Sequence, residues 1–178
     1  MRIAVIGTGH VGAALGAGWA AAGHQVIFGV RDPGATDVRE VLKSSQNLSA
    51  VAVSEAASKA DVVALAIPFA AVEEVLRNSA AQIKGKILID CTNPTTQWPA
   101  IDHSAGSGGE RVSEWAHGAR VVKAFNTTGF ENMRNPRFGE SNATMFYAGD
   151  DSAAKIIVGQ LAADLGFDPG GCRAFIAS

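Results

Sequence analysis

This chain of 178 residues has few charged side chains and no strong excess of either sign. Charged side chains make up 18% of the sequence, and the formal net charge is -2 at pH 7. The chain therefore lacks the positively charged surface that binds nucleic acid. It also lacks the cationic amphipathic helix that binds a membrane surface. No apolar run in the sequence reaches the ~18 residues of a membrane span. We therefore expect a small-molecule partner, with neither nucleic acid nor membrane involved.

Cysteine is also scarce. The two cysteines, Cys91 and Cys172, lie far apart and form no Cys-x-x-Cys unit, which argues against a metal site and against a thioredoxin-like motif. Two reduced thiols in a cytoplasmic protein are expected. The chain opens directly on an apolar segment, without a charged leader or a cleavage site, which also favours a cytoplasmic location. Its length fits a single domain over residues 1–178.

A glycine-rich turn follows the first apolar segment. Residues 2–6 form a strand candidate that runs directly into Gly7-x-Gly9-x-x-Gly12, and apolar residues recur at helical spacing behind it. Gly7 permits a tight strand-to-helix turn, Gly9 lets a pyrophosphate approach bare backbone, and Gly12 lets the helix lie close to the strand. The helix directs its unpaired N–H groups and positive dipole end at the loop. This stretch predicts a dinucleotide site, with a purely structural turn as the alternative.

Two polar side chains, Thr8 and His10, lie within this loop. Thr8 either donates its hydroxyl to a phosphate oxygen or is simply exposed to solvent. At a helix N-terminus the charged form of His10 is disfavoured until a pyrophosphate arrives, and we predict no catalytic role for it. The other histidines lie in expected turns or loops, where solvation is predicted: His24, His103 and His117.

Strand-like and helix-like segments alternate along the rest of the chain. Further strands are expected at residues 25–30, 48–53, 61–67, 86–90, 120–125 and 143–148, and helices at 10–22, 38–44, 54–60, 72–85, 107–118 and 152–165. Unbroken apolar runs are typical of strands covered on both faces. The alternation predicts an α/β fold: a doubly wound, mostly parallel sheet with helices on both faces and its ligand at the carboxyl ends of the strands.

Local signals add detail to this pattern. Two pairs with capping-box spacing predict helix starts, Asp37 with Glu40 and Ser107 with Glu110. On the first helix, Gly16 lies one turn after the last glycine of the motif, where both would allow close approach to the sheet. A long surface loop is expected at residues 95–109, and irregular structure or a short helix at 130–142. The apolar side of the last helix is expected to consist of Ile156, Ile157, Leu161 and Leu165.

The end of the strand at residues 25–30 decides between the nicotinamide cofactors, because it faces the adenosine ribose. Asp32 lies near the interval at which an acidic residue binds the 2′-hydroxyl, but it precedes a proline and is predicted to form a turn. Arg31, directly after Val30, would pair with a 2′-phosphate, and the small Gly29 leaves space for it. The local chemistry therefore favours NADPH over NADH.

Three strand exits are expected on the edge that carries the glycine loop: Ile67-Pro68-Phe69, Cys91-Thr92-Asn93-Pro94 and Phe125-Asn126-Thr127-Thr128. They bring amides, hydroxyls and an apolar Pro-Phe pair, but no obvious general acid or base. We therefore predict no catalytic side chain and no metal site. Hydride transfer between two rings requires stacking and alignment, for which such a pocket would suffice. Asn93 and Asn126 either contact a ligand or cap turns.

Several segments together resemble the coenzyme F420-dependent NADP oxidoreductase family: Gly7–Gly12, Gly29–Pro33, Ala66–Pro68, Asp90–Pro94 and, most specifically, Val121–Thr127. The resemblance covers nearly the whole chain. It implies a Rossmann-type domain in which NADP(H) lies along the strand ends and a deazaflavin, coenzyme F420, stacks on the nicotinamide as second substrate. Thr8 and Arg31 would touch the phosphates, and Pro68, Asn93 and Asn126 would line the ring pocket.

The cofactor-binding residues expected from the motif and the resemblance together are Gly7, Thr8, Gly9, His10, Val11, Gly12, Val30, Arg31, Ile67, Pro68, Asn93, Pro94, Ala124 and Asn126. Val30 stands where the reductase often has serine. Members of the family usually continue into a further helical segment used in the pocket and in dimer contacts. We expect residues 1–178 to lack that segment, and the choice between monomer and homodimer stays open.

Two alternative functions remain for this chain. One is a reductase of another acceptor, such as a flavin, a metal, a small imine or an acid, and the other is a non-catalytic dinucleotide-binding domain.

Overall fold

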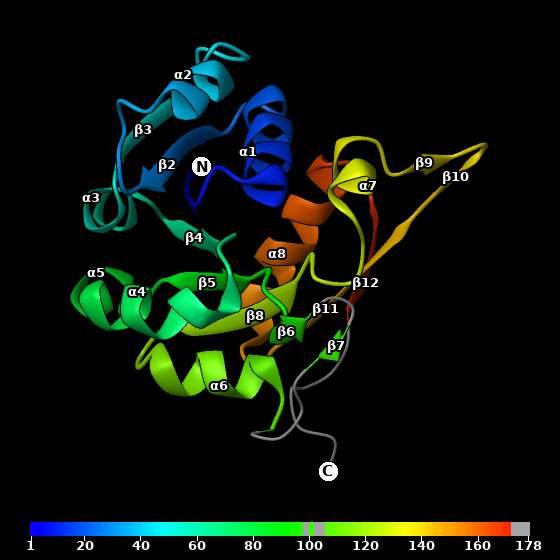
Figure 1. The fold of residues 1–178 in the computed structure, drawn as a ribbon. Coiled ribbons are helices and arrows are strands. Elements are labelled where there is room, and N and C mark those ends of the chain that lie inside the picture. The colour runs from blue at the N-terminus through cyan, green and yellow to red at the C-terminus, as the bar shows by residue number, and fades with distance from the viewer. Residues whose placement is uncertain (98–99, 102–105, 172–178) are drawn as a thin grey trace.

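A single twisted sheet forms the centre of the molecule (Figure 1). The computed structural model describes residues 1–97, 100–101 and 106–171. In the order β12-β11-β8-β5-β4-β1-β2-β3 the sheet contains Asp168–Gly171, Thr144–Ala148, Arg120–Ala124, Ile87–Asp90, Val62–Leu65, Arg2–Ile6, Gln25–Val30 and Leu48–Ala52. The strands from β8 to β3 are parallel, whereas β11 runs antiparallel to β8 and β12 parallel to β11. The predicted doubly wound, mostly parallel sheet is confirmed.

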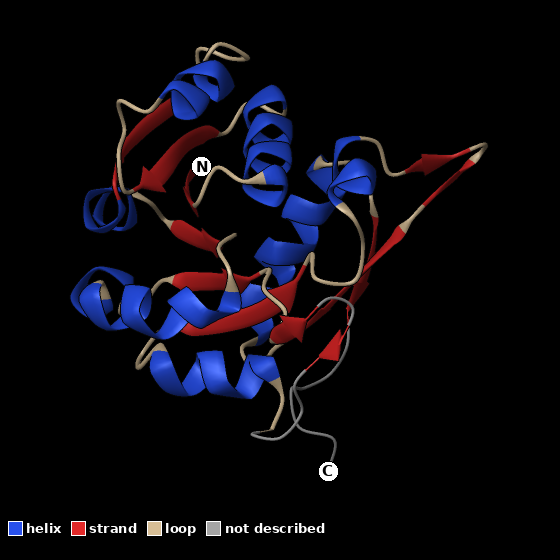
Figure 2. Ribbon diagram, in the orientation of Figure 1, coloured by secondary structure: helices blue, strands red, loops and turns tan. Residues whose placement is uncertain are grey.

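Helices cover both faces of the sheet (Figure 2). They are α1 (His10–Ala21), α2 (Thr36–Leu42), α3 (Val53–Lys59), the 3₁₀ turn η1 (Phe69–Ala71), α4 (Val72–Asn78), α5 (Ala80–Ile83), α6 (Gly108–Trp115), α7 (Phe130–Arg134) and α8 (Ser152–Asp164). The expected helix over residues 72–85 is interrupted at Ser79, so that α4 and α5 are separate. No helix among the described residues is long and apolar enough to cross a membrane.

Alternate residues of each central strand enter two different cores. In β1, Ile3 and Val5 belong to the core beneath α1 and α8, whereas Ala4 and Ile6 belong to the core beneath α3, α4 and α6. All four side chains are essentially inaccessible to solvent. Because both faces are covered, neither set of alternate positions can be polar, and this is why the strands appear in the sequence as unbroken apolar runs.

Helix α1 lies unusually close to the sheet. A Cβ atom at Gly16 would lie 2.3 Å from Cζ of Phe28, and one at Gly12 would lie 2.1 Å from the carbonyl oxygen of Gly7. The close approach predicted from these two glycines is confirmed. Trp19, on the same helix, is fully buried and donates its indole N–H to the Leu161 carbonyl oxygen at 2.9 Å. This bond joins α1 to α8 within one core.

Two of the expected helix details differ from the structure. The capping box of Ser107 and Glu110 is present in both directions, but α2 begins after Ala35 without any side-chain cap. The predicted role of Asp37 as its N-cap is therefore wrong; this residue lies in the first helical turn. In α8, Ile156 is 73% exposed instead of buried. Leu161 is buried as predicted. The rest of the buried face of α8 uses smaller residues that a search for large apolar side chains overlooks: Ala154, Val158, Gly159 and Ala162.

Short strand pairs occupy two regions that were expected to be irregular. Within the predicted loop, β6 (Thr95–Gln97) pairs antiparallel with β7 (Ala100–Ile101), and after α7 a hairpin joins β9 (Arg137–Phe138) to β10 (Ser141–Asn142). Strands of two or three residues are too short to show a period in the sequence. The expectations for His103, for Cys172 and for the rest of residues 98–99, 102–105 and 172–178 lie outside the described residues.

Replacement of Gly16 by alanine tests the close packing of α1. The added methyl group would collide with the Phe28 ring. Overpacking of this kind costs about 1–3 kcal/mol, and the better helix propensity of alanine offsets roughly 1 kcal/mol of it. We expect Gly16→Ala to lower the free energy of unfolding in urea by up to about 2 kcal/mol. The double variant with Phe28→Leu should show a smaller loss than the sum of the two single changes; strict additivity would contradict a direct contact.

Candidate cofactor site

The glycine loop is held in place by both strands beside β1. Gly7 has a φ of 102°, and its N–H donates to the Gly29 carbonyl oxygen of β2 at 3.0 Å. A Cβ at Gly7 would lie 2.6 Å from the carbonyl oxygen of Ala66, which follows β4. Both the backbone conformation and the neighbouring atoms therefore require glycine at this position. The loop is a rigid turn between β1 and α1.

The second glycine of the loop leaves an open backbone surface. Gly9 is the N-cap residue of α1, has no side chain to cap the helix and is exposed. A Cβ placed on it would have no neighbour within 4 Å. The first turn of α1 contains no acidic residue, so no carboxylate competes for its free N–H groups. Such a helix end attracts an anion through its N–H groups and its dipole.

The side chains around the loop differ in their surroundings. Thr8 is half-buried, and the ring of the exposed His10 stacks on that of Phe130 with centroids 4.6 Å apart and an interplanar angle of 19°. Arg134 lies over the same phenyl ring, with its Cζ 5.2 Å from the centroid. Val11 packs against the core beneath α1. Helix α7 therefore rests directly on the loop.

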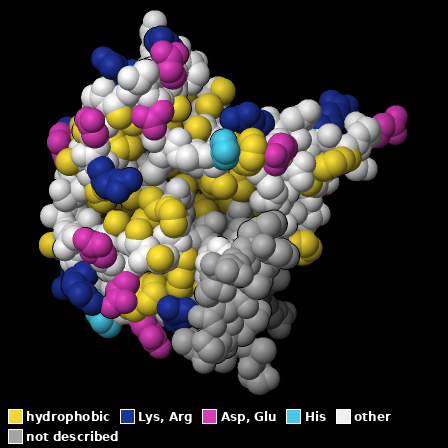
Figure 3. Space-filling model, viewed as in Figure 1, with side chains coloured by type: hydrophobic (Ala, Val, Ile, Leu, Met, Phe, Trp, Pro, Cys, Tyr) yellow, Lys and Arg dark blue, Asp and Glu magenta, His cyan; other side chains and the backbone are white. Residues whose placement is uncertain are grey.

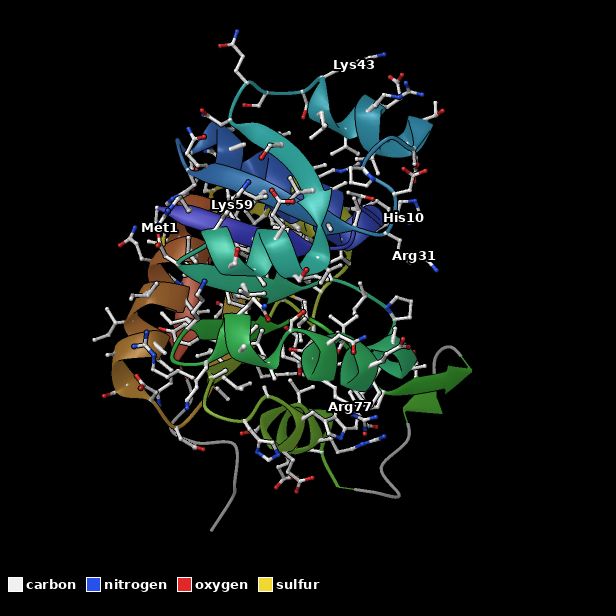
Figure 4. The ribbon with its side chains drawn as sticks, turned by 90° about the vertical axis from the view of Figure 1, so that its left-hand side faces the viewer. Met1, His10, Arg31, Lys43, Lys59 and Arg77 are labelled. Carbon is white, nitrogen blue, oxygen red and sulfur yellow. The ribbon has the colours of Figure 1, made fainter. Side chains whose placement is uncertain are left out.

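At the end of β2, Arg31 extends into solvent on the side of the molecule where His10 also lies (Figure 4). Its guanidinium has no hydrogen bond or ion pair to any described residue. Asp32 forms a turn as predicted, because its carboxylate accepts the Gly34 N–H at 2.9 Å. Val30 is buried in the core and cannot face a ligand with its side chain. At the end of β2, Arg31 is therefore the side chain that can contact a ligand.

The role expected of Gly29 is wrong. A Cβ at this position would lie 2.6 Å from Cδ1 of Ile6 and 3.2 Å from both Ala56 Cβ and Val53 Cα. The missing side chain therefore lets α3 pack against the sheet. The space beside Gly29 is therefore filled by Ile6 and α3 and is not left free for a ligand.

An amide pair joins the exits of β5 and β8. Asn93 donates from Nδ2 to the Asn126 carbonyl oxygen at 2.9 Å, and Asn126 donates from Nδ2 to Oδ1 of Asn93 at 3.3 Å. The structure thus brings these two predicted site residues together, and each is only half-buried. Pro68 is exposed at the neighbouring exit of β4, Ile67 is half-buried and Pro94 is buried. Ala124 lies in the core beneath α1, so its side chain supports the site without facing it.

Beneath this pair lies a buried ion pair that the sequence analysis missed. The Asp90 carboxylate is fully buried and accepts from Lys123 Nζ at 2.8 Å and from the N–H and hydroxyl of Thr92 at 2.9 and 2.6 Å. Lys123 also donates to the Thr92 carbonyl oxygen. Asp90 and Lys123 lie opposite each other in the register of β5 and β8. The signal in the sequence was one charge of each sign at the ends of two apolar strands.

Between the ion pair and the amide pair the backbone is strained. Phe125 has a φ of 63°, the only positive value for a described residue other than glycine, and such strain costs of order 1–3 kcal/mol. Its buried ring packs edge-on against Trp19 with centroids 5.7 Å apart, and its N–H donates to the sulfur of Met145 at 3.3 Å. These contacts hold the turn that brings Asn126 towards Asn93.

The remaining candidate groups play structural parts. Cys91 is a free, buried thiol whose pKa is raised far above its ordinary value by burial and by the Asp90 carboxylate, so it is a poor nucleophile. His24, expected to be solvated, instead lies 2.9 Å from the Asp164 carboxylate with its side chain 12% exposed. His117 is exposed as predicted. No cluster of metal-binding side chains occurs among the described residues.

The surface above the strand exits is mainly apolar. Figure 3 shows hydrophobic side chains gathered over the middle of this face, with charged side chains around them. The candidate site thus combines an open helix end, an arginine without a partner among the described residues and a neutral group of amide and proline side chains, all along the carboxyl edge of the sheet. An elongated ligand with phosphates at one end and an apolar ring at the other matches this arrangement.

Comparison with known proteins agrees with this description. The chain is 36% identical over 141 residues to the F420-dependent NADP reductase of Methanothermobacter thermautotrophicus, an alignment that covers 71% of this chain and 61% of that protein. It is 28% identical over 169 residues to the metalloreductase STEAP3 of Rattus norvegicus, covering 94% of this chain and 33% of that one. The chain therefore spans about three fifths of the length of the curated reductases that it matches.

A solved structure matches almost the whole fold. A candidate F420-dependent NADP reductase of Arthrobacter sp. FB24 superposes with a TM-score of 0.88 at 30% identity, covering 98% of this chain and 85% of that one. The model of the family described as NADP oxidoreductase, coenzyme F420-dependent, matches residues 2–94. The chain therefore belongs to the coenzyme F420-dependent NADP oxidoreductase family, as its motifs suggest.

Proposed function

We propose that this protein binds NADPH along the carboxyl edge of its sheet and transfers a hydride between it and a deazaflavin, coenzyme F420, or a related ring acceptor. One observation carries the proposal: the uncapped end of α1 at Gly9, the unpaired Arg31 and the neutral Asn93–Asn126 pair follow β1, β2, β5 and β8 on the same edge. In the sheet these strands lie in the order β2-β1-β4-β5-β8, so their ends offer partners for the 2′-phosphate, the pyrophosphate and the nicotinamide in the order in which a dinucleotide crosses such a sheet.

The glycine loop fits the pyrophosphate. Gly9 offers backbone with no side chain in the way, and the first turn of α1 offers N–H groups that no side chain satisfies. The charge that these groups stabilise comes from the dipole, so no lysine or arginine is needed within the loop. His10, held flat against Phe130, can donate to a phosphate oxygen at the rim of the same helix end.

Arg31 favours the phosphorylated cofactor. Its guanidinium is exposed and has no carboxylate partner among the described residues, while one oxygen of the Asp32 carboxylate accepts the Gly34 N–H in the turn. A free guanidinium pairs well with a 2′-phosphate through charge-assisted hydrogen bonds. The side chains at the end of β2 thus support NADPH over NADH.

The ring pocket aligns reactants and does not supply protons. Asn93 and Asn126 present amide groups matched to a nicotinamide carboxamide, and Pro68 gives a flat apolar contact. The Asp90 and Lys123 charges beneath them neutralise each other. When bound, NADPH supplies the hydride. The protein's contribution is then to hold two rings in contact and exclude water, and neither requires an ionisable side chain.

Another acceptor is the second candidate. The similarity to a metalloreductase covers 94% of the chain, so a flavin or a metal complex could take the place of the deazaflavin above the same dinucleotide. The binding of NADPH is common to both candidates. They differ only in the molecule that stacks on the nicotinamide.

The acceptor is tested by mixing the purified protein with NADPH and oxidised coenzyme F420. We expect the visible absorbance of the deazaflavin to decrease with time as it is reduced, and an NADPH-free sample serves as control. A constant absorbance, together with tight NADPH binding measured by calorimetry, would reject the deazaflavin and favour the second candidate.

The pyrophosphate contact is tested by a pair of glycine variants. Gly9→Ala adds a methyl group where the protein leaves open space, so the unfolding midpoint should stay near that of the wild type while the Kd for NADPH rises at least about tenfold. Gly12→Ala collides with the Gly7 carbonyl oxygen and should lose both stability, by about 1–3 kcal/mol, and binding. If Gly9→Ala bound NADPH normally, the phosphates would not lie on this loop.

Cofactor choice is tested at Arg31. Replacement by alanine removes the partner of a 2′-phosphate, so the Kd for NADPH should rise about tenfold or more while that for NADH changes little. Arg39→Ala, on the neighbouring helix α2, is the matched control because it removes the same charge from an exposed position. Equal losses for both cofactors in Arg31→Ala would show that this side chain does not bind the 2′-phosphate.

A further inference from the structure

A second arginine, Arg111, stacks on two aromatic rings at the opposite end of the candidate site. Arg111, in α6, places its Cζ 4.7 Å from the ring centroid of Phe69 and 5.2 Å from that of Trp115. The two rings are themselves 5.5 Å apart and inclined at 48°. Contacts with aromatic faces restrict a guanidinium without occupying its N–H groups, which lie in its plane.

The N–H groups of Arg111 have no partner among the described residues. Three neighbouring charged residues are engaged elsewhere: Glu110 accepts the Ser107 N–H at 2.8 Å in the capping box, and Arg77 pairs with Glu73 at 2.6 Å. Arg111 is nevertheless only partly exposed. A half-buried guanidinium that is oriented by aromatic rings and has no hydrogen bond to the described part of the chain is suited to bind an external anion.

The packing of α6 places this arginine at the rim of the ring pocket. Phe69 directly follows Pro68 at the exit of β4. A Cβ at Gly108, the first residue of α6, would lie 3.0 Å from Cδ of Pro94 and 3.4 Å from Cε2 of Phe69. The first turn of α6 thus packs on the exits of both β4 and β5, and Arg111 lies one turn further along.

The proposed partners of the dinucleotide phosphates lie elsewhere. In the sheet order β2-β1-β4-β5, Arg31 follows β2, the glycine loop follows β1 and Pro94 follows β5. Three strand spacings, roughly 14 Å, separate the end of β2 from that of β5, and two, roughly 10 Å, separate the glycine loop from it. With the phosphates over β1 and β2, the nicotinamide lies over β4 and β5. An anion near Arg111 would therefore belong to the second substrate.

We propose that Arg111, stacked between Phe69 and Trp115, binds a phosphate or carboxylate on the side chain of the hydride acceptor. The inference rests on the proposed function, because it assumes that the nicotinamide lies over β4 and β5. The acceptor is thereby narrowed to a ring system with an acidic side chain. Coenzyme F420 and flavin mononucleotide share this chemistry, whereas their rings without phosphate, such as riboflavin, lack it.

The experiment compares acceptors with and without the acidic side chain. Binding is measured by acceptor fluorescence in the presence of NADP⁺, which cannot donate a hydride. Two pairs are used: coenzyme F420 against its phosphate-free deazaflavin, and flavin mononucleotide against riboflavin. For at least one pair the wild type should bind the acidic member at least about tenfold more tightly. Arg111→Gln should abolish this preference and leave binding of the uncharged member unchanged.

Controls separate the site from general effects of charge and folding. Arg77→Ala removes a cation from the neighbouring helix α4 and should keep the full preference. Arg111→Lys keeps the positive charge but loses the planar guanidinium, and it should keep only part of the preference for the acidic acceptor. Circular dichroism checks that each variant is folded. NADPH affinity should stay unchanged in Arg111→Gln, because the cofactor's phosphates bind elsewhere.

Two results would overturn the inference: a wild type with no preference in either pair, or an Arg111→Gln variant that keeps it. Both are distinct from failure of the proposed function. Reduction of the uncharged ring by NADPH without any preference would leave the function standing and remove the role of Arg111. A preference that Arg111→Gln abolishes, without any reduction of either ring, would keep the anion site and reject hydride transfer to these acceptors.

Discussion

The site depends on a contact between two pieces of backbone that leaves no room for a side chain. Gly12 lies against the carbonyl oxygen of Gly7, so that the first turn of α1 begins directly on the strand that precedes it. This contact directs the helix axis at the sheet edge and leaves Gly9 uncovered. The anion binding proposed for the loop would thus follow from steric fit, because the glycines bring the helix end to the surface and contribute no charge of their own.

The other half of the site depends on a buried charge pair. Replacing such a pair by apolar residues is often neutral or stabilising, so the Asp90–Lys123 pair is weak evidence for stability. The ion pair fixes the ends of β5 and β8 relative to each other, since each charge lies at the end of one of these strands. With the strained Phe125 beside it, the pair holds the amides of Asn93 and Asn126 in one arrangement. The neutral amide pair therefore has a polar, rigid support.

The sequence predicted the fold well because the dominant forces act locally and repeat along the chain. Strands buried on both faces must be apolar at every position, and the glycines of the loop are required by φ or by contact distance, so both appear directly in the sequence. Prediction failed where a residue's role depends on a distant partner. The function assigned to Gly29 was wrong because Ile6 and α3 occupy the space beside it. His24 was expected in solvent because Asp164, 140 positions away, could not be foreseen.

The candidate site residues also divide into those that local sequence signals predict and those that depend on a distant partner. The positions of Gly9, Arg31, Asn93 and Asn126 at strand exits followed from the alternation of elements. The stacking of Arg111 on Phe69 and Trp115 did not, because it depends on how α6 crosses the exits of β4 and β5. Side chains that act in pairs across elements are therefore the part of a site that the sequence conceals.

The stack of Phe130 on His10 links the two ends of the site mechanically. Residues 126–130 run without a break from the amide pair to the phenyl ring that stacks on the first residue of α1. The end of β8 and the first turn of α1 are therefore joined by five consecutive residues. If a ligand orders this segment, the entropy of ordering it is lost only once for a ligand that spans both ends. Under the proposed function, a whole dinucleotide would then gain affinity beyond the sum of its halves.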